Sequence, residues 1–225
     1  MLYALGEILL VFIGILLALQ VNTWWEDYKA RQYEKKILLE IQISLQEGIE
    51  DVTSLMERGR RTSDGALRIT HHLTGQPLSS DSLYMLVDDL RLRRVFQYNS
   101  GPYESLKSAG LERISNDSLR IALIALYEDD LPITDKLINE VLRERISDNE
   151  DRYRELFSLV GLKVSQGGGL IPKTSMDPGL VSSELFLSFV HEAFVNGRLL
   201  ENAMASLEDK MQNLKGLISR ELKRP

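Results

Sequence analysis

Apolar residues form one unbroken block near the start of the chain. Every residue from Ile8 to Leu19 is apolar or glycine, and Glu7 is the only charged residue among the first 25. A helix of about 20 mostly apolar residues is long enough to cross a bilayer. The pattern therefore predicts a transmembrane anchor over residues 1–25, followed by a water-soluble region over residues 26–225.

Two tryptophans, Trp24 and Trp25, stand where this block meets the charged residues that follow it. Paired indoles at such a boundary are typical of the aromatic belt at a membrane surface, so we expect both to act as interfacial anchors. A cleaved signal peptide would instead have a basic start and a small-residue cleavage site, and neither is present. We therefore expect the anchor to be retained.

Glu7, Gly14 and Ala18 fall close to one face of the predicted anchor, because steps of seven and four residues return to nearly the same side of a helix. Small residues on such a face let membrane helices pack closely, so the three form a candidate transmembrane seam. Glu7 has two interpretations. Its carboxyl is either buried in the seam, pairing subunits or passing protons, or solvated by headgroups near the end of the span. We favour headgroup solvation, because such a group reaches water at low cost.

Beyond the anchor, apolar positions recur at steps of three and four residues, and no long alternating run suggests a sheet. The predicted fold class is all-α: the N-terminal transmembrane helix, then an antiparallel helical bundle of three long and about three short helices. Gly59 and Gly65 predict a kink or break near residues 58–65, because glycine costs about 1 kcal/mol relative to alanine inside a helix. The expected long helices cover residues 26–72, 132–160 and 183–222, the short ones 81–92, 102–109 and 117–128, and a loop 161–179.

Composition and motifs give no sign of catalysis. The chain has no cysteine, three histidines and a formal net charge of −6, which argue against a disulfide scaffold, a zinc ribbon and a nucleic-acid partner. His191-Glu192 begins like a zinc-protease helix, but Val195 replaces the required second histidine. Residues 167–174 imitate a phosphate loop, but Pro172 stands where the second glycine should be. We expect no catalytic residue, metal or cofactor.

Two stretches of the chain form recognisable sequence motifs. The first begins Tyr3-Ala4-Leu5-Gly6-Glu7-Ile8 and continues through Gly14, Gln20, Asn22 and Trp24; the second is Tyr103-Glu104-Ser105-Leu106-Lys107-Ser108, followed by Gly110 and Ile114-Ser115-Asn116. They resemble the uncharacterised bacterial family called domain of unknown function 6090. The resemblance implies a single-pass protein of the cell envelope, and it implies no activity.

The orientation in the membrane follows from the resemblance more than from the residues. Members of the family carry a short basic stretch before the span, which keeps the N-terminus in the cytoplasm. This sequence starts at Met1-Leu2-Tyr3, so either its true start lies upstream or its orientation signal is weaker. The cations Lys29, Arg31, Lys35 and Lys36 by themselves favour a cytoplasmic domain. On the resemblance, we expect an inner-membrane protein with a periplasmic domain.

The family-like segment also contains the candidate interaction surface, formed by Tyr98, Tyr103, Glu104, Lys107 and Ser108. The alternative is a helix–turn–helix corner in which the glycines and proline of this segment serve backbone geometry only. We expect a non-enzymatic, membrane-tethered interaction module of the bacterial envelope: a scaffold, adaptor or accessory subunit. Its expected partners are the lipid bilayer, another envelope protein and, as an open alternative, a second copy of the chain. The competing hypotheses are an extracytoplasmic small-ligand sensor signalling through the membrane-proximal helix, and an envelope enzyme with an unrecognised site.

Overall fold

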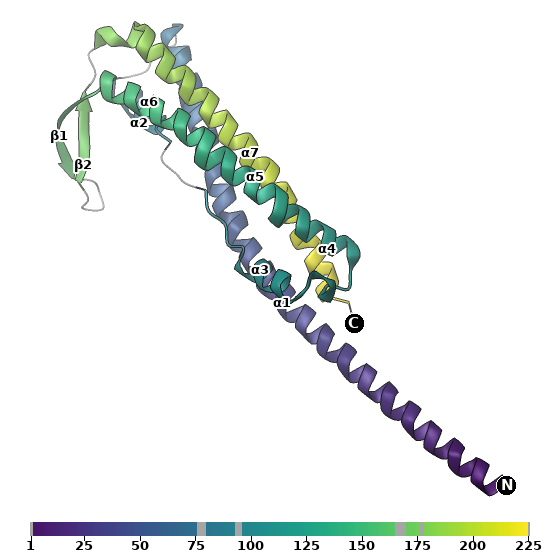
Figure 1. The fold of residues 1–225 in the computed structure, drawn as a ribbon. Coiled ribbons are helices and arrows are strands. Elements are labelled where there is room, and N and C mark those ends of the chain that lie inside the picture. The colour runs from purple at the N-terminus through teal and green to yellow at the C-terminus, as the bar shows by residue number, and fades with distance from the viewer. Residues whose placement is uncertain (1, 76–79, 93–95, 165–169, 176–177, 225) are drawn as a thin grey trace. The chain divides into compact units, whose positions relative to one another are not determined.

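The chain is built mainly of helices, which confirms the all-α prediction (Figure 1). The computed structural model describes residues 2–75, 80–92, 96–164, 170–175 and 178–224; within residues 2–12, it describes only the side chains of Leu10 and Phe12. The α-helices are α1 (Leu2–Leu73), α2 (Ser80–Asp89), α3 (Gly101–Ala109), α4 (Asp117–Ile124), α5 (Leu131–Lys136), α6 (Arg143–Leu156) and α7 (Glu184–Leu222). The short helical segments are η1 (Leu111–Arg113), η2 (Ala125–Asp130), η3 (Leu137–Leu142) and η4 (Pro178–Ser182).

Helix α1 runs without interruption through both the expected anchor and the first long helix, so the predicted break near residues 58–65 is wrong. Gly59 faces α7, where an added Cβ would come within 2.7 Å of the backbone oxygen of Gly197 and the backbone nitrogen of Glu201. Gly197 faces Gly59 in the same way, at 2.8 Å. The two glycines therefore let the helix backbones approach closely, and tertiary packing of this kind keeps α1 regular despite their poor helix propensity.

Helical structure continues from Asp117 to Leu156, where two helices separated by a short connection were expected. The connection is replaced by two π-helical segments, η2 and η3, on either side of α5. Pro132 lies in the first turn of α5, and its missing N–H breaks the regular hydrogen-bond ladder. A π-helical turn lets the helix absorb this defect without ending.

A two-stranded antiparallel hairpin occupies most of the expected loop over residues 161–179, which corrects that part of the prediction. Strand β1 (Ser158–Val164) pairs with β2 (Leu170–Ser175), with Ser158 opposite Ser175 and Val164 opposite Leu170. Each strand is too short to give a clear alternating pattern in the sequence, and Pro172 is a residue that lowers strand propensity. Each strand is stabilised by hydrogen bonds to the other strand, and the local sequence pattern does not show this pairing.

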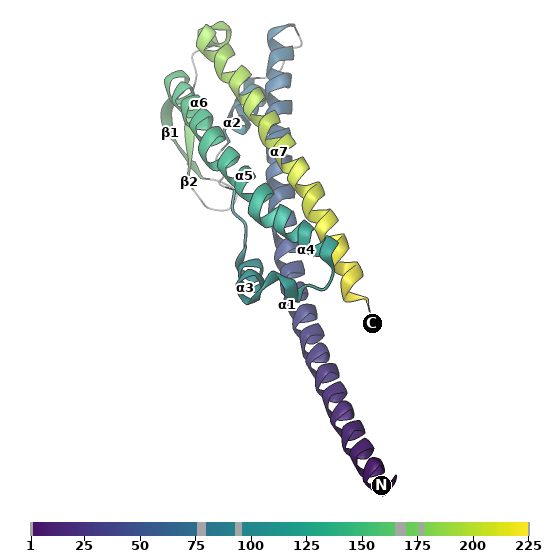
Figure 2. The same ribbon diagram turned by 45° about the vertical axis from the view of Figure 1, so that its right-hand side comes forward.

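The chain groups into two compact units. Unit 1 contains Met1–Gln46, Asn99–Ile124 and Asn213–Pro225, and unit 2 contains Glu47–Tyr98 and Ala125–Gln212. In unit 2, the later part of α1, α2, α6 and α7 surround an apolar core, and Figures 1 and 2 both show these parts of α1, α6 and α7 lying side by side. The core includes the aromatic side chains Tyr153, Phe157, Phe186 and Phe189.

Unit 1 packs α3 and α4 against the earlier part of α1 and the end of α7. Figure 2 shows α3 beside α1, where the Ser44 hydroxyl donates to the carbonyl oxygen of Asn99 at 2.9 Å. The buried apolar side chains of this unit come from all four helices and from Ile114: Ile37, Leu38, Ile41, Leu45, Tyr103, Leu106, Ile114, Leu119, Leu123, Leu214 and Ile218. The helix periodicity of the sequence predicts this inward-facing set on α1 and α7.

Among the residues with described side chains, which begin at Leu10, no helix combines the length and apolarity of a membrane span.

Candidate functional site

The predicted interaction surface divides between the core and the surface. Tyr103 is completely buried and packs into the core of unit 1, whereas Glu104, Lys107 and Ser108 lie exposed on α3. Tyr98 belongs to unit 2, where it is half-buried and its ring stacks on Phe96 with centroids 5.8 Å apart. The exposed part of the surface is therefore confined to one side of α3.

Pro102 and Gly110 have the backbone roles that the corner interpretation assigns to them. Pro102 lies in the first turn of α3, and Gly110 ends the helix with a φ of 105°, a conformation that favours glycine. This geometry explains both residues without any ligand.

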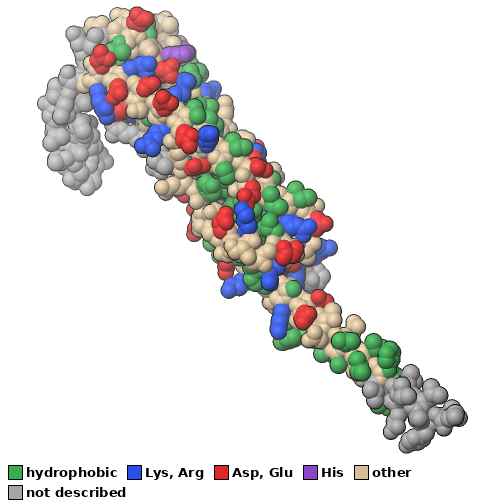
Figure 3. Space-filling view, in the orientation of Figure 1, with side chains coloured by type: hydrophobic (Ala, Val, Ile, Leu, Met, Phe, Trp, Pro, Cys, Tyr) green, Lys and Arg blue, Asp and Glu red, His purple; other side chains and the backbone are tan. Residues whose placement is uncertain are grey.

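The residues of the predicted anchor lie on a helix whose described side chains are exposed on every side. Glu7 is outside the residues with described side chains, Gly14 has no atom within 4 Å of its Cβ position, and Ala18 is exposed. Trp24 and Trp25 are 68% and 49% exposed. Lys29 places its Nζ 5.3 Å from the centre of the Trp25 ring. Figure 3 shows the apolar side chains of this part of α1 as a green patch.

A buried polar cluster lies in unit 1, around the turns of α1 that follow the predicted anchor. We call it the basal cluster; it consists of Arg31, Glu34, Ser115, Asn116 and Glu221. Glu34 and Glu221 are only 2% and 3% exposed, although carboxylates are rarely buried without partners. Both are paired with Arg31, at 2.7 Å from Glu34 and 3.1 Å from Glu221.

Each carboxylate of the basal cluster also accepts hydrogen bonds from the segment before α4. Glu34 Oε1 accepts from the backbone N–H of Ser115 at 2.8 Å and from its hydroxyl at 3.0 Å. Glu221 Oε2 accepts from the Asn116 amide at 2.8 Å, and this bond lowers the pKa of Glu221 against the opposing effect of desolvation. Arg31 lowers the same pKa further. The cluster thus gives both buried carboxylates charged and polar partners, and it favours the ionised form of Glu221.

The basal cluster joins three segments that are distant in sequence: α1, the turn before α4 and the end of α7. Arg31 donates to the backbone oxygens of Glu221 and Arg224, at 3.0 and 3.2 Å. Every polar group named here is used in the pairing, and none is placed as a nucleophile with an adjacent base. The chemistry supports a structural role, in which these pairs fasten the turn before α4 and the end of α7 to α1.

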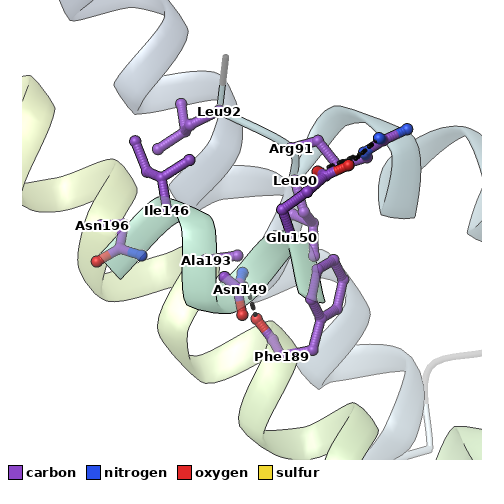
Figure 4. Close-up of a pocket in the computed structure, with 9 residues that line it drawn as sticks. All are labelled: Leu90, Arg91, Leu92, Ile146, Asn149, Glu150, Phe189, Ala193 and Asn196. Atoms are coloured by element: carbon purple, nitrogen blue, oxygen red, sulfur yellow. Dashed lines mark hydrogen bonds and ion pairs between the residues drawn. The ribbon is translucent and has the colours of Figure 1, made fainter. Parts of the chain in front are cut away.

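Unit 2 contains a small pocket, shown with its nine lining residues in Figure 4. We call it the inner pocket. At its rim Arg91 forms a two-pronged ion pair with Glu150, and the guanidinium carbon of Arg91 lies 4.0 Å from the centre of the Tyr153 ring. Deeper in, Asn149 Nδ2 donates to the backbone oxygen of Phe189 at 3.2 Å. Among the described buried side chains, Asn149 Oδ1 is the polar atom without a hydrogen-bond partner.

Local sequence patterns indicate these two sites only in part. Ser115-Asn116 lies in a family-like segment, and Asn116 Oδ1 accepts from the backbone N–H of Leu119 at 3.2 Å, as a helix cap does. Nothing local pairs that segment with Glu34 or Glu221. Asn149 sits on the inward face of α6 by its spacing from Tyr153, but a single asparagine on a helix carries no signal of an unpaired oxygen.

No known protein family matches the chain, and no characterised protein and no solved structure matches it either. The resemblance to the envelope family stays a prediction. Within the described residues, no group of three or more His, Cys, Asp or Glu side chains is placed to hold a metal ion.

Proposed function

We propose that this protein is a membrane-tethered, non-catalytic helical interaction module of the bacterial envelope, acting as a scaffold, adaptor or accessory subunit. The observation that carries the proposal is the exposed apolar surface of α1. Leu10, Phe12, Ile13, Ile15, Leu16, Leu17 and Leu19 are each between 48% and 74% exposed. Consecutive residues of a helix point in all directions, and a helix that is apolar all round is stable only inside a large core or a membrane.

A lipid bilayer is the partner that fits this surface best. Residues 2–9 extend the apolar block of the sequence to a length sufficient for a span. Trp24 and Trp25 would then lie at one interface, with the Lys29 ammonium over the Trp25 ring on the water side. Following the family resemblance, we propose that the span over residues 1–25 lies in the inner membrane and that residues 26–225 lie in the periplasm.

Membrane flotation tests the anchor. The full-length chain is expected to float with liposomes of bacterial lipid and to resist extraction at alkaline pH. The double variant Ile13→Asp, Leu16→Asp should lose flotation, because each carboxylate placed in hydrocarbon costs about 3 kcal/mol. Ile121→Asp is the matched control, since Ile121 is 66% exposed on α4, outside the anchor. Equal flotation of all three proteins would defeat the proposal of a membrane span.

Capture of a partner tests the interaction module. The exposed residues Glu104 and Lys107 on α3 are the surface that we propose for recognition. After crosslinking in living cells, the charge exchange Glu104→Lys, Lys107→Glu is expected to lower recovery of the partner at least tenfold, with helicity by circular dichroism unchanged. The exchange Lys36→Glu, Glu40→Lys, on another exposed pair of unit 1, is the control. If both exchanges leave recovery intact, α3 is not the recognition surface.

A second candidate function, sensing of a small ligand, is favoured by the inner pocket of unit 2. A buried acceptor without a partner is costly, so a pocket that contains one is disposed to take a hydrogen-bond donor. A sensor requires ligand binding and also a response elsewhere in the chain. Hydrogen exchange of α1 with and without ligand measures that response. If exchange in α1 is unchanged, the protein binds the ligand but does not act as a sensor.

A further inference from the structure

We propose that the inner pocket is a binding site for one neutral O–H donor, which donates its hydrogen bond to Asn149 Oδ1. The inference deepens the ligand-binding candidate function and is independent of the membrane anchor. The shared chemistry has two sources, a single bound water or the hydroxyl of a small hydroxy acid, and the experiment below separates them.

The orientation of the Asn149 amide is set by its neighbour. Nδ2 donates to the Phe189 carbonyl oxygen at 3.2 Å. Exchanging the amide nitrogen and oxygen would bring two acceptors together, so the group left unpaired is the acceptor Oδ1. Asn149 is only 6% exposed, and bulk water therefore does not satisfy this oxygen.

The two arginines beside the pocket use their donors elsewhere. Arg91 is bonded to Glu150 through Nε and NH2, and its NH1 lies 3.5 Å from Asp88. Arg145 donates its Nε–H to Asn196 Oδ1 at 2.8 Å. No donor of the described residues bonds to Asn149 Oδ1, so the position is open to a donor from outside the chain.

Size and charge restrict that donor. The space open to the centre of a water molecule in the inner pocket is about 10 Å³, which is room for a group of water size. Arg91 and Glu150 in the lining already neutralise each other, so an ammonium group there would be an uncompensated charge beside the apolar side chains of Leu90, Ile146 and Ala193. A hydroxyl or a water has the right size without this penalty.

An adjoining hollow gives a ligand room beyond the hydroxyl. It shares Arg91, Ile146 and Glu150 with the inner pocket and adds Arg143 and Arg154. Arg91 and Arg154 in its lining are paired with Glu150 and Asp151, so Arg143 supplies the positive charge that favours an anion there. A small hydroxy acid therefore matches both parts, with its hydroxyl at Asn149 Oδ1 and its carboxylate at Arg143.

Thermal unfolding of the full-length chain in detergent micelles, with three probes, tests the site. Lactate has both groups, propionate lacks the hydroxyl and glycerol lacks the carboxylate. If the ligand's hydroxyl fills the pocket, lactate should raise the melting temperature with an apparent Kd about tenfold lower than propionate or glycerol, the effect of one good hydrogen bond. Arg143→Gln should weaken lactate binding, while Arg68→Gln, a change of an exposed arginine on α1, should not.

A high-resolution crystal structure of the full-length chain separates the sources. With no preference for lactate, an ordered water within hydrogen-bonding distance of Asn149 Oδ1 assigns the site to water. An empty site and no preference for lactate would overturn the inference. Asn149→Leu should abolish the preference or the water, and if it fails to fold, the wild-type probes and structure decide alone. Membrane flotation of the same protein tests the anchor separately, so an error in the proposed pocket and an error in the proposed anchor can be distinguished.

Discussion

Glu221 is a buried residue of unit 1 whose ionised form is favoured by folding. The Asn116 amide and Arg31 hold its pKa below the ordinary value of 4.5 in the folded chain. A group whose pKa is lowered by folding stabilises the fold above its unfolded pKa, and this contribution disappears as the pH falls through the folded value. The contribution is therefore complete at neutral pH and is lost below about pH 4.5.

Glu221→Gln should consequently destabilise the full-length chain at pH 7, and its difference from the wild type should shrink as the pH is lowered from 4.5. Urea unfolding at pH 7, 5, 4 and 3 measures this difference. Glu112→Gln, at an exposed position of η1, is expected to follow the wild type throughout. A Glu221→Gln curve parallel to the wild type at all four pH values would show that the carboxylate charge does not stabilise the fold.

At the scale of elements, the contact between α1 and α7 in unit 2 depends on glycine at both sides. Gly197→Ala would place a Cβ 2.8 Å from the backbone oxygen of Gly59 and the backbone nitrogen of Ser63, which cannot turn aside as a side chain can. Alanine gains about 1 kcal/mol of helix propensity, but overpacking against backbone costs about 1–3 kcal/mol or more. We expect the cost of the clash to exceed the gain in helix propensity.

Gly197→Ala is therefore expected to lower the free energy of unfolding by about 1–2 kcal/mol. Gly216→Ala on the same helix is the matched control, because its only neighbour within 4 Å is the Arg220 side chain at 3.8 Å. The control should raise stability by up to about 1 kcal/mol. Urea unfolding of both variants checks the opposite signs, and stabilisation by Gly197→Ala would refute close backbone packing.

At the scale of the whole molecule, the sequence predicts what repeats along a helix and not what pairs across it. The apolar spacing identifies α7 to within one residue at its start, 183 against Glu184. It misreads Gly59 as a weak point, because the reason for that glycine lies on α7. The basal cluster and the unpaired Asn149 oxygen cannot be predicted from the sequence for the same reason. Glu34, Glu221 and Phe189 look like ordinary helix residues, and their roles depend on contacts with distant segments.

The ion pair between Arg31 and Glu221 also affects the order in which unit 1 can fold during synthesis. These residues are 190 positions apart, and unit 1 combines segments from both ends of the chain. A ribosome makes the chain from its N-terminus, so Gln42 and Gln46 on α1 leave the ribosome long before their partners Ser219 and Lys215 on α7 exist. Contacts of such long separation form slowly. The apolar face of α1 therefore stays without its α7 partner until the 39 residues of α7 have been made.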